Sequence, residues 1–194
     1  MLINCLCKPF YACSVSICML QLSILDQTPI RKGSNATEAL QESIELVKLA
    51  DEWGYTRYWL SEHHNTVTLA GAAPEVLIAR LAAESKRIRL GSGGIMLPNH
   101  SALKVAENFR LLEALYPNRI DLGLGRAPGG DRITAQLLNP SNTFDPQEYI
   151  QQIRDLQDFL TDTYIYNGKQ GTVIICNFQG QSTRRHRNRS YCNF

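Results

Sequence analysis

The central part of this 194-residue sequence has no cysteine: none occurs between Cys18 and Cys176, and all six cysteines lie near the two ends. A domain held together by disulfides distributes its cysteines through its loops, so this absence excludes a disulfide scaffold for the centre. The spacing of the six cysteines matches no zinc-binding pattern either. We therefore expect a reducing compartment, hence a cytoplasmic protein, and no bound metal.

Acidic residues are missing from the C-terminal end, since all eighteen lie between Asp26 and Asp162. Over that range they outnumber fourteen lysines and arginines, which gives a net charge of about −4 and excludes a centre that binds nucleic acid by charge. Five basic residues and no acidic ones follow Asp162. The basic residues 184–187 allow a nucleic-acid-binding arm, but we interpret residues 163–194 as a divergent, basic, disordered tail.

A long unbroken apolar run is also missing from the start of the chain. Residues 1–18 are apolar, but Lys8 and Pro9 interrupt them. A signal peptide has a positive start followed by a continuous apolar stretch, and a membrane-spanning helix needs about 20 such residues. We therefore expect no membrane association, and we treat residues 1–18 as an extension of unknown status that precedes a domain of residues 19–162.

What the sequence does contain is a regular alternation of strand and helix patterns. Apolar strand-like runs begin about thirty residues apart, at 20–25, 57–61, 88–97 and 120–124, and a helical pattern follows each of them,. This rhythm predicts an α/β fold, either a TIM (β/α)8 barrel or a doubly wound sheet. A complete barrel needs about 250 residues, so residues 19–162 predict an incomplete barrel with about four βα units.

The glycine fingerprint of dinucleotide-binding sheets, G-x-G-x-x-G, is absent. At residues 123–125 the first two glycines have the right spacing, but Pro128 occupies the third position. At residues 91–93 the third position is Met96. The doubly wound alternative therefore loses its main support.

Residues suited to chemistry follow the predicted strands, where a barrel places its catalytic loops. They are Asp26, the run Glu62-His63-His64, the pair Gly93-Gly94, and Arg126. Arg126 stands among glycine and proline and suits a phosphate or another anion, because a guanidinium donates paired hydrogen bonds. A surface arginine on a turn is the other interpretation.

The two histidines beside Glu62 allow three interpretations. A histidine can act as a general acid or base while the carboxylate fixes its tautomer. The three residues can instead bind a metal, or one histidine can pack beneath the barrel rim while the other is solvated. We prefer the acid/base, because adjacent residues at a strand end point in opposite directions and rarely bind one ion together.

Three segments resemble, in the same order, the N-terminal half of the bacterial-luciferase-like (LLM class) flavin-dependent monooxygenases. They are LSILDQTPI at 22–30, WLSEHHN at 59–65 and LGSGGIMLPNHSALKVAENFRLLEALYPNRIDLGLGRAPG at 90–129. The fold of that family is a TIM barrel. The resemblance ends near Asp162 and covers about half of a complete barrel.

The resemblance implies FMN as the cofactor and a role for each site residue. His63, the first histidine after Glu62, is expected to be the acid/base near the flavin. Gly93-Gly94, a pair that often carries an unusual peptide bond in the family, is expected to lie against the isoalloxazine, because glycine lets a flat ring approach the backbone. Arg126 is expected to help hold the FMN phosphate, and we assign Asp26 to the same cofactor-binding set.

The resemblance also implies an activity and its partners. Reduced FMN, supplied by a separate flavin reductase, and O2 would oxidise a small organic substrate such as an aldehyde; a deazaflavin is the less favoured cofactor. We expect a homodimer for the full-length protein. We interpret this chain as truncated and inactive by itself, and expect it to bind FMN weakly or not at all. The alternative is a non-catalytic flavin-binding protein, or a half-barrel that dimerises to pair its open strand edges.

Overall fold

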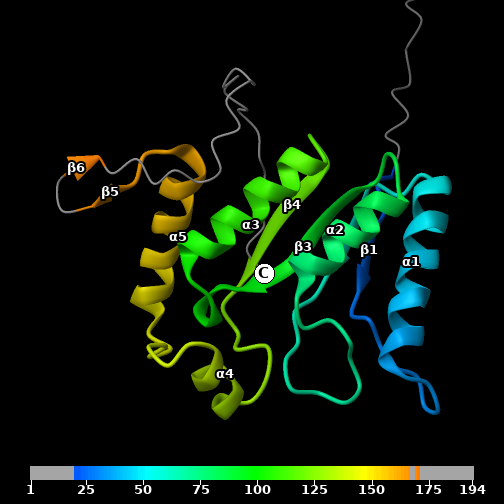
Figure 1. Cartoon of the computed structure of the whole chain (residues 1–194), viewed down its shortest axis with the longest axis horizontal. Helices are drawn as coiled ribbons and strands as arrows, with labels where there is room; N and C mark the ends of the chain where they lie inside the picture. The colour runs from blue at the N-terminus through cyan, green and yellow to red at the C-terminus, as the bar shows by residue number, and fades with distance from the viewer. Residues whose placement is uncertain (1–19, 167–168, 171–194) are drawn as a thin grey trace, which may run out of the picture.

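The structure is a computed structural model that describes residues 20–166 and the backbone of residues 169–170 (Figure 1). The strands are β1 (Ser23–Asp26), β2 (Arg57–Leu60), β3 (Arg89–Met96), β4 (Ile120–Gly125), β5 (Ile165–Tyr166) and β6 (Lys169–Gln170). The helices are α1 (Ala36–Glu52), α2 (Pro74–Glu84), the 3₁₀ helix η1 (Leu97–Asn99), α3 (Ala102–Leu115), α4 (Arg132–Leu138) and α5 (Pro146–Thr161). The extension at 1–18 and most of the tail at 163–194 lie outside the described residues.

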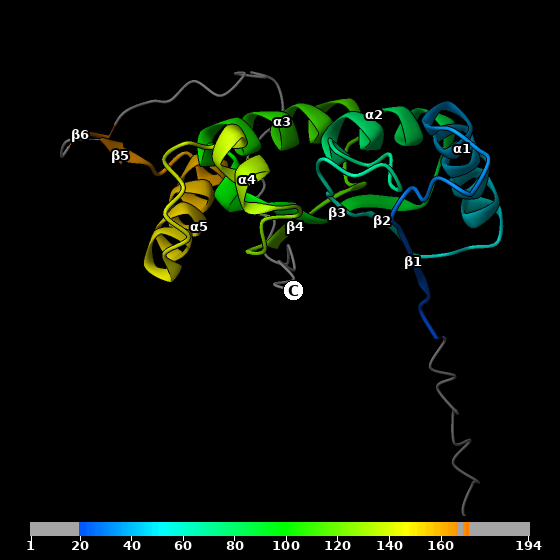
Figure 2. The ribbon, with the colours of Figure 1, turned by 90° about the horizontal axis from the view of Figure 1, so that it is seen from below.

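Strands β1 to β4 form one parallel sheet in the order in which they occur along the chain. Helices α1, α2 and α3 lie on the same face of this sheet (Figure 2). A doubly wound sheet reverses its strand order and carries helices on both faces, whereas a TIM barrel adds each strand beside the last with the helices outside. The sheet therefore confirms the prediction of an incomplete barrel with four βα units.

The core lies between the sheet and these helices. Side chains alternate along a strand, so Tyr58 and Leu60 of β2 are buried on the helix side, while Trp59 between them points to the other face,. Helix α1 begins after Asn35, which caps it together with Glu38, and the Glu38 N–H donates to Asn35 Oδ1 at 3.1 Å,. The fully buried apolar side chains include Val47, Tyr58, Leu60, Ile78, Leu81, Leu90, Ile95, Leu97 and Leu156.

The opposite face of the sheet carries a charged cluster and, further along the strands, a glycine-rich area. At the amino ends of the strands, the Nε atoms of Arg57 and Arg89 donate to the Asp121 carboxylate at 3.1 and 2.7 Å. One layer higher, the Trp59 indole lies against Gly91, where an added Cβ would be 2.6 Å from the ring. None of the described helices covers this face (Figure 2), which corresponds to the inside of a barrel.

Four described elements were not predicted: η1, α4, β5 and β6. Helix α4 has only seven residues, too few for an apolar period to stand out in the sequence. Strands β5 and β6 form a small antiparallel hairpin in which Ile165 pairs with Gln170. The sequence also predicts a short β-like run at 172–176, which lies outside the described residues.

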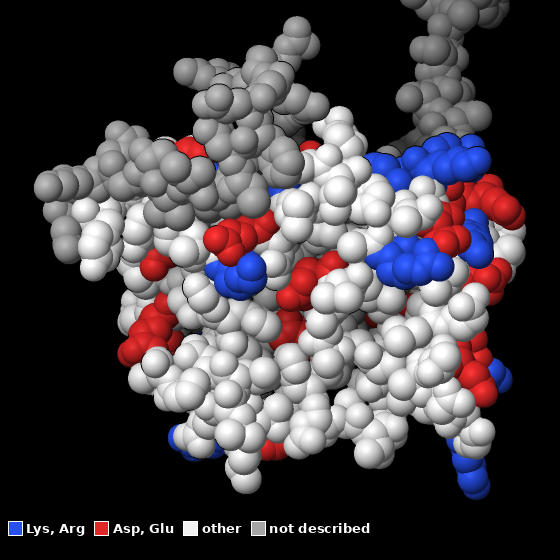
Figure 3. Space-filling model, viewed as in Figure 1, with Lys and Arg blue, Asp and Glu red and all other residues white. Residues whose placement is uncertain are grey.

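None of the described helices is long and apolar enough to cross a membrane. On the face shown in Figure 3, acidic and basic side chains of the described residues lie among one another.

Replacing Gly123 in β4 by alanine is expected to destabilise the sheet, because the new Cβ would lie 2.3 Å from the backbone oxygen of Ser92. Overpacking of this kind lowers the free energy of unfolding by about 1–3 kcal/mol or more. Gly33→Ala is the control: its Cβ would meet nothing within 4 Å, and only the positive φ of 83° opposes it, at a cost of about 1–2 kcal/mol. Urea unfolding measures both, and a smaller loss at Gly123 than at Gly33 would contradict this packing.

Candidate functional site

The carboxyl ends of β2, β3 and β4 bring most of the predicted site residues to one edge of the sheet. In the strand register, Leu60 pairs with Ser92, and Met96 pairs with Gly125. The segment 62–64 that follows β2 therefore lies beside the second half of β3, and Arg126 follows β4 on the other side of β3. The predicted convergence of the histidines, the glycine pair and Arg126 at one rim matches this register.

Glu62 is the polar centre of this rim. Its side chain is fully buried, yet its carboxylate has three hydrogen-bond partners. Its Oε1 lies 2.6 Å from Nε2 of His64 and 2.7 Å from Nε2 of His100, and its Oε2 accepts the backbone N–H of Met96 at 2.9 Å. A buried carboxylate needs such donors to offset lost hydration, and here they come from three different chain segments.

These contacts set the charges of the pair Glu62–His100. Burial alone would raise the pKa of the Glu62 carboxyl, but the hydrogen bonds from His100 and His64 and the charge of His100 lower it below its ordinary value. Burial alone would lower the pKa of His100, but the hydrogen bond to Glu62 and the negative charge of Glu62 raise it above its ordinary value. At mildly acidic pH the buried Glu62 carboxylate and the partly exposed His100 imidazolium therefore form an ion pair,.

The ring of His63 lies against the hydroxyl of Ser61, whereas the sequence analysis expected a carboxylate, that of Glu62, to fix its tautomer. Glu62 binds His64 and His100, whereas Nδ1 of His63 lies 3.2 Å from Oγ of Ser61. The backbone N–H of His63 donates to the carbonyl of Gly71 at 2.9 Å. Adjacent side chains at the strand end point in opposite directions, as the strand period requires, so Ser61, not Glu62, orients the His63 ring.

The three side chains Glu62, His64 and His100 also have the composition of a metal site. One ligating atom from each lies within 4.8 Å of the others. In a tetrahedral site with bonds of about 2.0–2.2 Å, ligand atoms are separated by about 3.3 Å, whereas Glu62 Oε1 is only 2.6–2.7 Å from both imidazole nitrogens. The distances are those of charge-assisted hydrogen bonds.

The glycine pair of β3 forms a part of the sheet with no room for side chains. The peptide bond between Gly93 and Gly94 is cis. A Cβ on Gly93 would lie 3.1 Å from Cβ of Trp59 and 3.3 Å from Leu25, and one on Gly94 would lie 2.8 Å from the backbone of Leu124. Neither glycine could carry a side chain without a tight contact, so both present bare backbone, with the side chains of Trp59 and Leu25 beside Gly93,.

Asp26 lies at the end of β1 but faces the helix layer. Its Oδ2 accepts hydrogen bonds from Oγ of Ser43 on α1 at 2.6 Å and from the Tyr58 hydroxyl at 2.7 Å, and its Oδ1 accepts the N–H of Thr28. Burial and the Asp26 charge raise the pKa of the Tyr58 phenol, which therefore stays a donor. The structure places Asp26 as an anchor between β1, α1 and β2, on the opposite face of the sheet from Trp59 and the Gly93 backbone.

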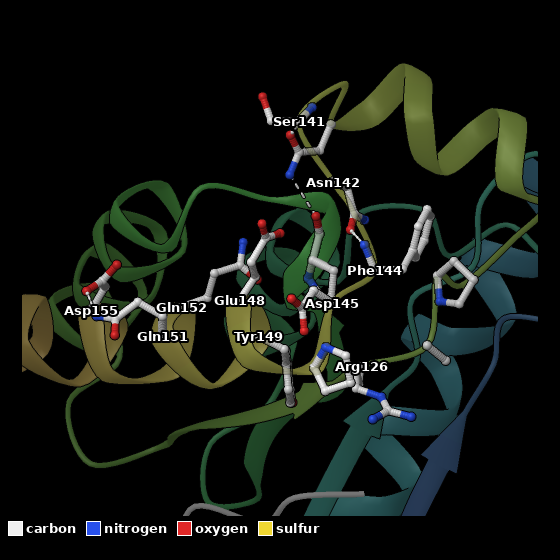
Figure 4. A pocket seen from close by; sticks show the side chains of 15 residues that line it. Arg126, Ser141, Asn142, Phe144, Asp145, Glu148, Tyr149, Gln151, Gln152 and Asp155 are labelled. Atoms are coloured by element: carbon white, nitrogen blue, oxygen red, sulfur yellow. Dashed lines mark hydrogen bonds between the residues drawn. The ribbon is translucent and has the colours of Figure 1, made fainter.

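Arg126 is exposed and, among the described residues, its guanidinium makes no hydrogen bond. It lies at the edge of a cavity of about 590 Å³ between the loop after β4 and the first turns of α5. Figure 4 shows Tyr149 of α5 extending toward the side of the cavity where Arg126 lies. The cavity is lined by Pro98, Arg126, Ala127, Pro128, Asn139, Ser141, Asn142, Phe144, Asp145, Pro146, Glu148, Tyr149, Gln151, Gln152 and Asp155.

Parallel βα units with a polar site at the carboxyl ends of the strands define a protein with a TIM-barrel-type fold. The family profile described as luciferase-like monooxygenase matches residues 20–164 of the sequence. The chain belongs to the luciferase-like monooxygenase family.

Three known proteins show how much of that family is present. The chain is 45% identical to the N-acetyl-S-alkylcysteine monooxygenase of Bacillus subtilis over 146 aligned residues. The alignment covers 75% of the chain and 44% of the relative. The structure of apo-MsnO8 superimposes with a TM-score of 0.72 at 43% identity, over 76% of the chain and 45% of that protein. The FMN complex of the oxygenating constituent of the Pseudomonas putida 3,6-diketocamphane monooxygenase shares the fold, with a TM-score of 0.61 at 20% identity over 73% and 38%. The chain spans less than half the length of each.

Two contributors to the site were missed in the sequence, Ser61 and His100. His100 is thirty-eight residues from Glu62 along the chain, and their contact depends on the register between β2 and β3. The available signal was its position directly after Pro98 and Asn99, at the carboxyl end of β3, where barrel loops carry function. Ser61 stands two residues before His63, a spacing that brings side chains of one strand to the same face.

The Glu62–His100 pair predicts a window of maximal stability. The lowered pKa of Glu62 contributes stability above its ordinary value of 4.5 that is lost as the pH falls through the folded-state pKa,. The raised pKa of His100 contributes stability below its ordinary value of 6.5 that is lost as the pH rises through the folded-state pKa,. Stability should therefore be greatest between these ordinary values. Urea midpoints measured from about pH 4 to about pH 9 test this, and His100→Gln should flatten the alkaline side; an unchanged pH profile would contradict the assignment.

Proposed function

We propose that this chain carries the catalytic rim of an FMN-dependent monooxygenase, which uses reduced FMN and O2 to oxidise a small organic substrate. The observation that carries the proposal is the joint placement of a bare glycine backbone at Gly93-Gly94, the exposed cation of Arg126 and the ring of His63 on one strand edge. Membership of the luciferase-like monooxygenase family supports it.

The layout of the rim suits the cofactor. The glycine pair lies shortly before Met96 in β3, and Met96 pairs with Gly125, which directly precedes Arg126. In the proposed arrangement the ring lies at the glycine pair, the phosphate lies at Arg126, and the ribityl chain joins them along the ends of β3 and β4. The oxygenating constituent of the 3,6-diketocamphane monooxygenase, which shares the fold and was solved in complex with FMN, supports this proposal.

Each residue then has a definable task. FMN, when bound, supplies the chemistry with oxygen. Gly93 and Gly94 present backbone to the ring, Trp59 and Leu25 bound the ring site on the same face of the sheet, and Arg126 neutralises the phosphate. His63, whose Nδ1 is held by Ser61, can hold or release a proton at Nε2 near the reacting atoms.

Several finer points belong to the same proposal. We favour FMN over a deazaflavin because a neighbour of the same fold, the oxygenating constituent of the 3,6-diketocamphane monooxygenase, contains FMN. A separate flavin reductase would supply the reduced cofactor. An aldehyde is one suitable substrate, and the name of the Bacillus subtilis relative adds thioethers as a second class to test.

A half-barrel that dimerises without catalysis is the second candidate. The uncovered face of the sheet favours it, because Leu25 is 57% exposed there, and in the described residues β1 and β4 each pair on one side only. Unpaired edges of this kind associate readily with another chain. A compact dimer in sedimentation, together with no oxygen consumption in the presence of FMN and a flavin reductase, would favour this candidate over the enzyme.

Removing Arg126 is expected to weaken FMN binding selectively. Because a guanidinium contributes charge-assisted bonds to a phosphate, Arg126→Ala should lower FMN affinity by about 10- to 100-fold. Riboflavin, which has no phosphate, should bind the variant as well as it binds the original chain. Quenching of flavin fluorescence, followed up to millimolar flavin, measures both affinities. Arg154→Ala, at an exposed site on α5, is the control; equal losses for FMN and riboflavin would contradict the phosphate role.

Removing the ring of His63 should affect turnover more than binding. With a flavin reductase and an aldehyde or thioether substrate, His63→Asn should lower the rate of product formation by about 10²- to 10⁴-fold. The affinity for FMN should stay within about threefold, because His63 is not assigned to the phosphate or to the ring surface. A variant that keeps the full rate would contradict a proton-transfer role for His63.

A further inference from the structure

We propose that His64 and His100, joined through the buried carboxylate of Glu62, are positioning residues that hold the loop 126–130 against the end of β3. They thereby fix the backbone from which Arg126 projects, and so determine how well the chain distinguishes a phosphorylated flavin from one without phosphate. The ligand part of this inference rests on the proposed function; the loop-holding part stands on the contacts alone.

The first step is that Glu62 ties three segments together. His64 belongs to the loop after β2, Met96 ends β3, and His100 follows η1. All three bond to the same fully buried carboxylate at 2.6–2.9 Å. Losing one donor leaves a buried charge short of a partner, which is costly. The three segments are therefore held at fixed relative positions.

The second step is that the loop after β4 rests directly on His64. The backbone N–H of His64 donates to the carbonyl of Gly129 at 2.8 Å. A Cβ on Gly129 would lie 2.9 Å from Met96 Cγ and 3.1 Å from the Glu62 carbonyl, and one on Gly130 would lie 3.1 Å from the His64 carbonyl. Backbone lies on backbone here, so a shift of His64 is transmitted to the loop.

The third step is a second tether from the other histidine. Asn99, the buried neighbour of His100, donates from Nδ2 to the carbonyl of Pro128 at 2.7 Å. The Glu62–His100 bond thus fixes the segment that holds Pro128, while the Glu62–His64 bond fixes the one that holds Gly129. Both carbonyls lie within three residues of Arg126.

The fourth step concerns what the two histidines are free to do. Nε2 of each ring already points at Oε1 of Glu62, so neither nitrogen is directed at a bound ligand. Arg126, by contrast, is exposed and has no hydrogen-bond partner among the described residues. Its placement depends on its backbone, and a preorganised cation binds a phosphate with less loss of conformational entropy.

The test compares FMN with riboflavin in His64→Leu and His100→Leu. Each variant should reduce the preference for FMN over riboflavin by about tenfold while leaving riboflavin affinity unchanged. In an Arg126→Ala background the same changes should have no further effect, since they act through Arg126. Equal losses for both flavins, an unchanged preference, or an additive loss in the Arg126→Ala background would overturn the proposal.

Two further variants and one additive separate positioning from other roles. His64→Gln and His100→Gln keep a side-chain N–H that can reach Glu62, so each should restore part of the FMN preference lost in the leucine variants. Lys104→Leu, an exposed change on α3, should leave the preference unchanged. Addition of EDTA to the original chain should also have no effect; loss of the preference with EDTA would show that an ion holds the loop and would overturn the proposal.

If the original chain binds neither flavin, the proposed function is refuted, but the loop-holding role of the two histidines is still open to test. Hydrogen–deuterium exchange then tests that role directly. The backbone amide of residue 64, which donates to Gly129, should lose protection about tenfold in both leucine variants, relative to the intrinsic exchange rate of the residue at that position. Amides of the β2–β3 ladder should keep their protection, which shows that the variants are folded. Unchanged protection at residue 64 in such folded variants would overturn the proposal.

Discussion

The rim of this half-barrel is organised by one buried charge. Glu62 has no exposed surface, and a carboxylate in that position is tolerated only with donors around it. The donors are two imidazoles and one backbone amide, from the loop after β2, the end of β3 and the segment after η1. The hydrogen bonds to this one carboxylate thus fix the relative positions of three chain segments, which a parallel sheet by itself would only place near one another.

The alternation of side chains along the strands gives the sheet two different faces. One face packs Tyr58, Leu60 and Leu90 against the helices, and Asp26 is held there as well. The other face carries Trp59 and the bare backbone of Gly93, with the Arg57–Asp121–Arg89 cluster below them. Side chains alternate between the two faces of the sheet along each strand. This alternation produces both the flat surface suited to a ring, in the middle of the strands, and the polar network of Glu62, at their carboxyl ends.

The sequence predicts the architecture well because its signals are local. The βα rhythm locates the four strands of the sheet, with the largest error at β1, which begins at Ser23 instead of residue 20. The partners of Glu62 were beyond such reasoning, because the contact with His100 depends on how β2 and β3 are aligned. The neighbouring His63 was the nearer candidate in sequence, yet the strand period turns it toward Ser61. Asp26 shows the same limit, since its position at a strand end does not reveal which face it occupies.

The central claim is that His63, Gly93-Gly94 and Arg126 surround a single flavin. Backbone amide chemical shifts of an isotope-labelled sample, recorded during titration with FMN, test it most directly. The account predicts that the largest shift changes occur together at residues 63–64, 93–96 and 126–130, with one common saturation curve. Changes confined to other segments, or separate saturation curves at the glycine pair and at the Arg126 loop, would contradict it.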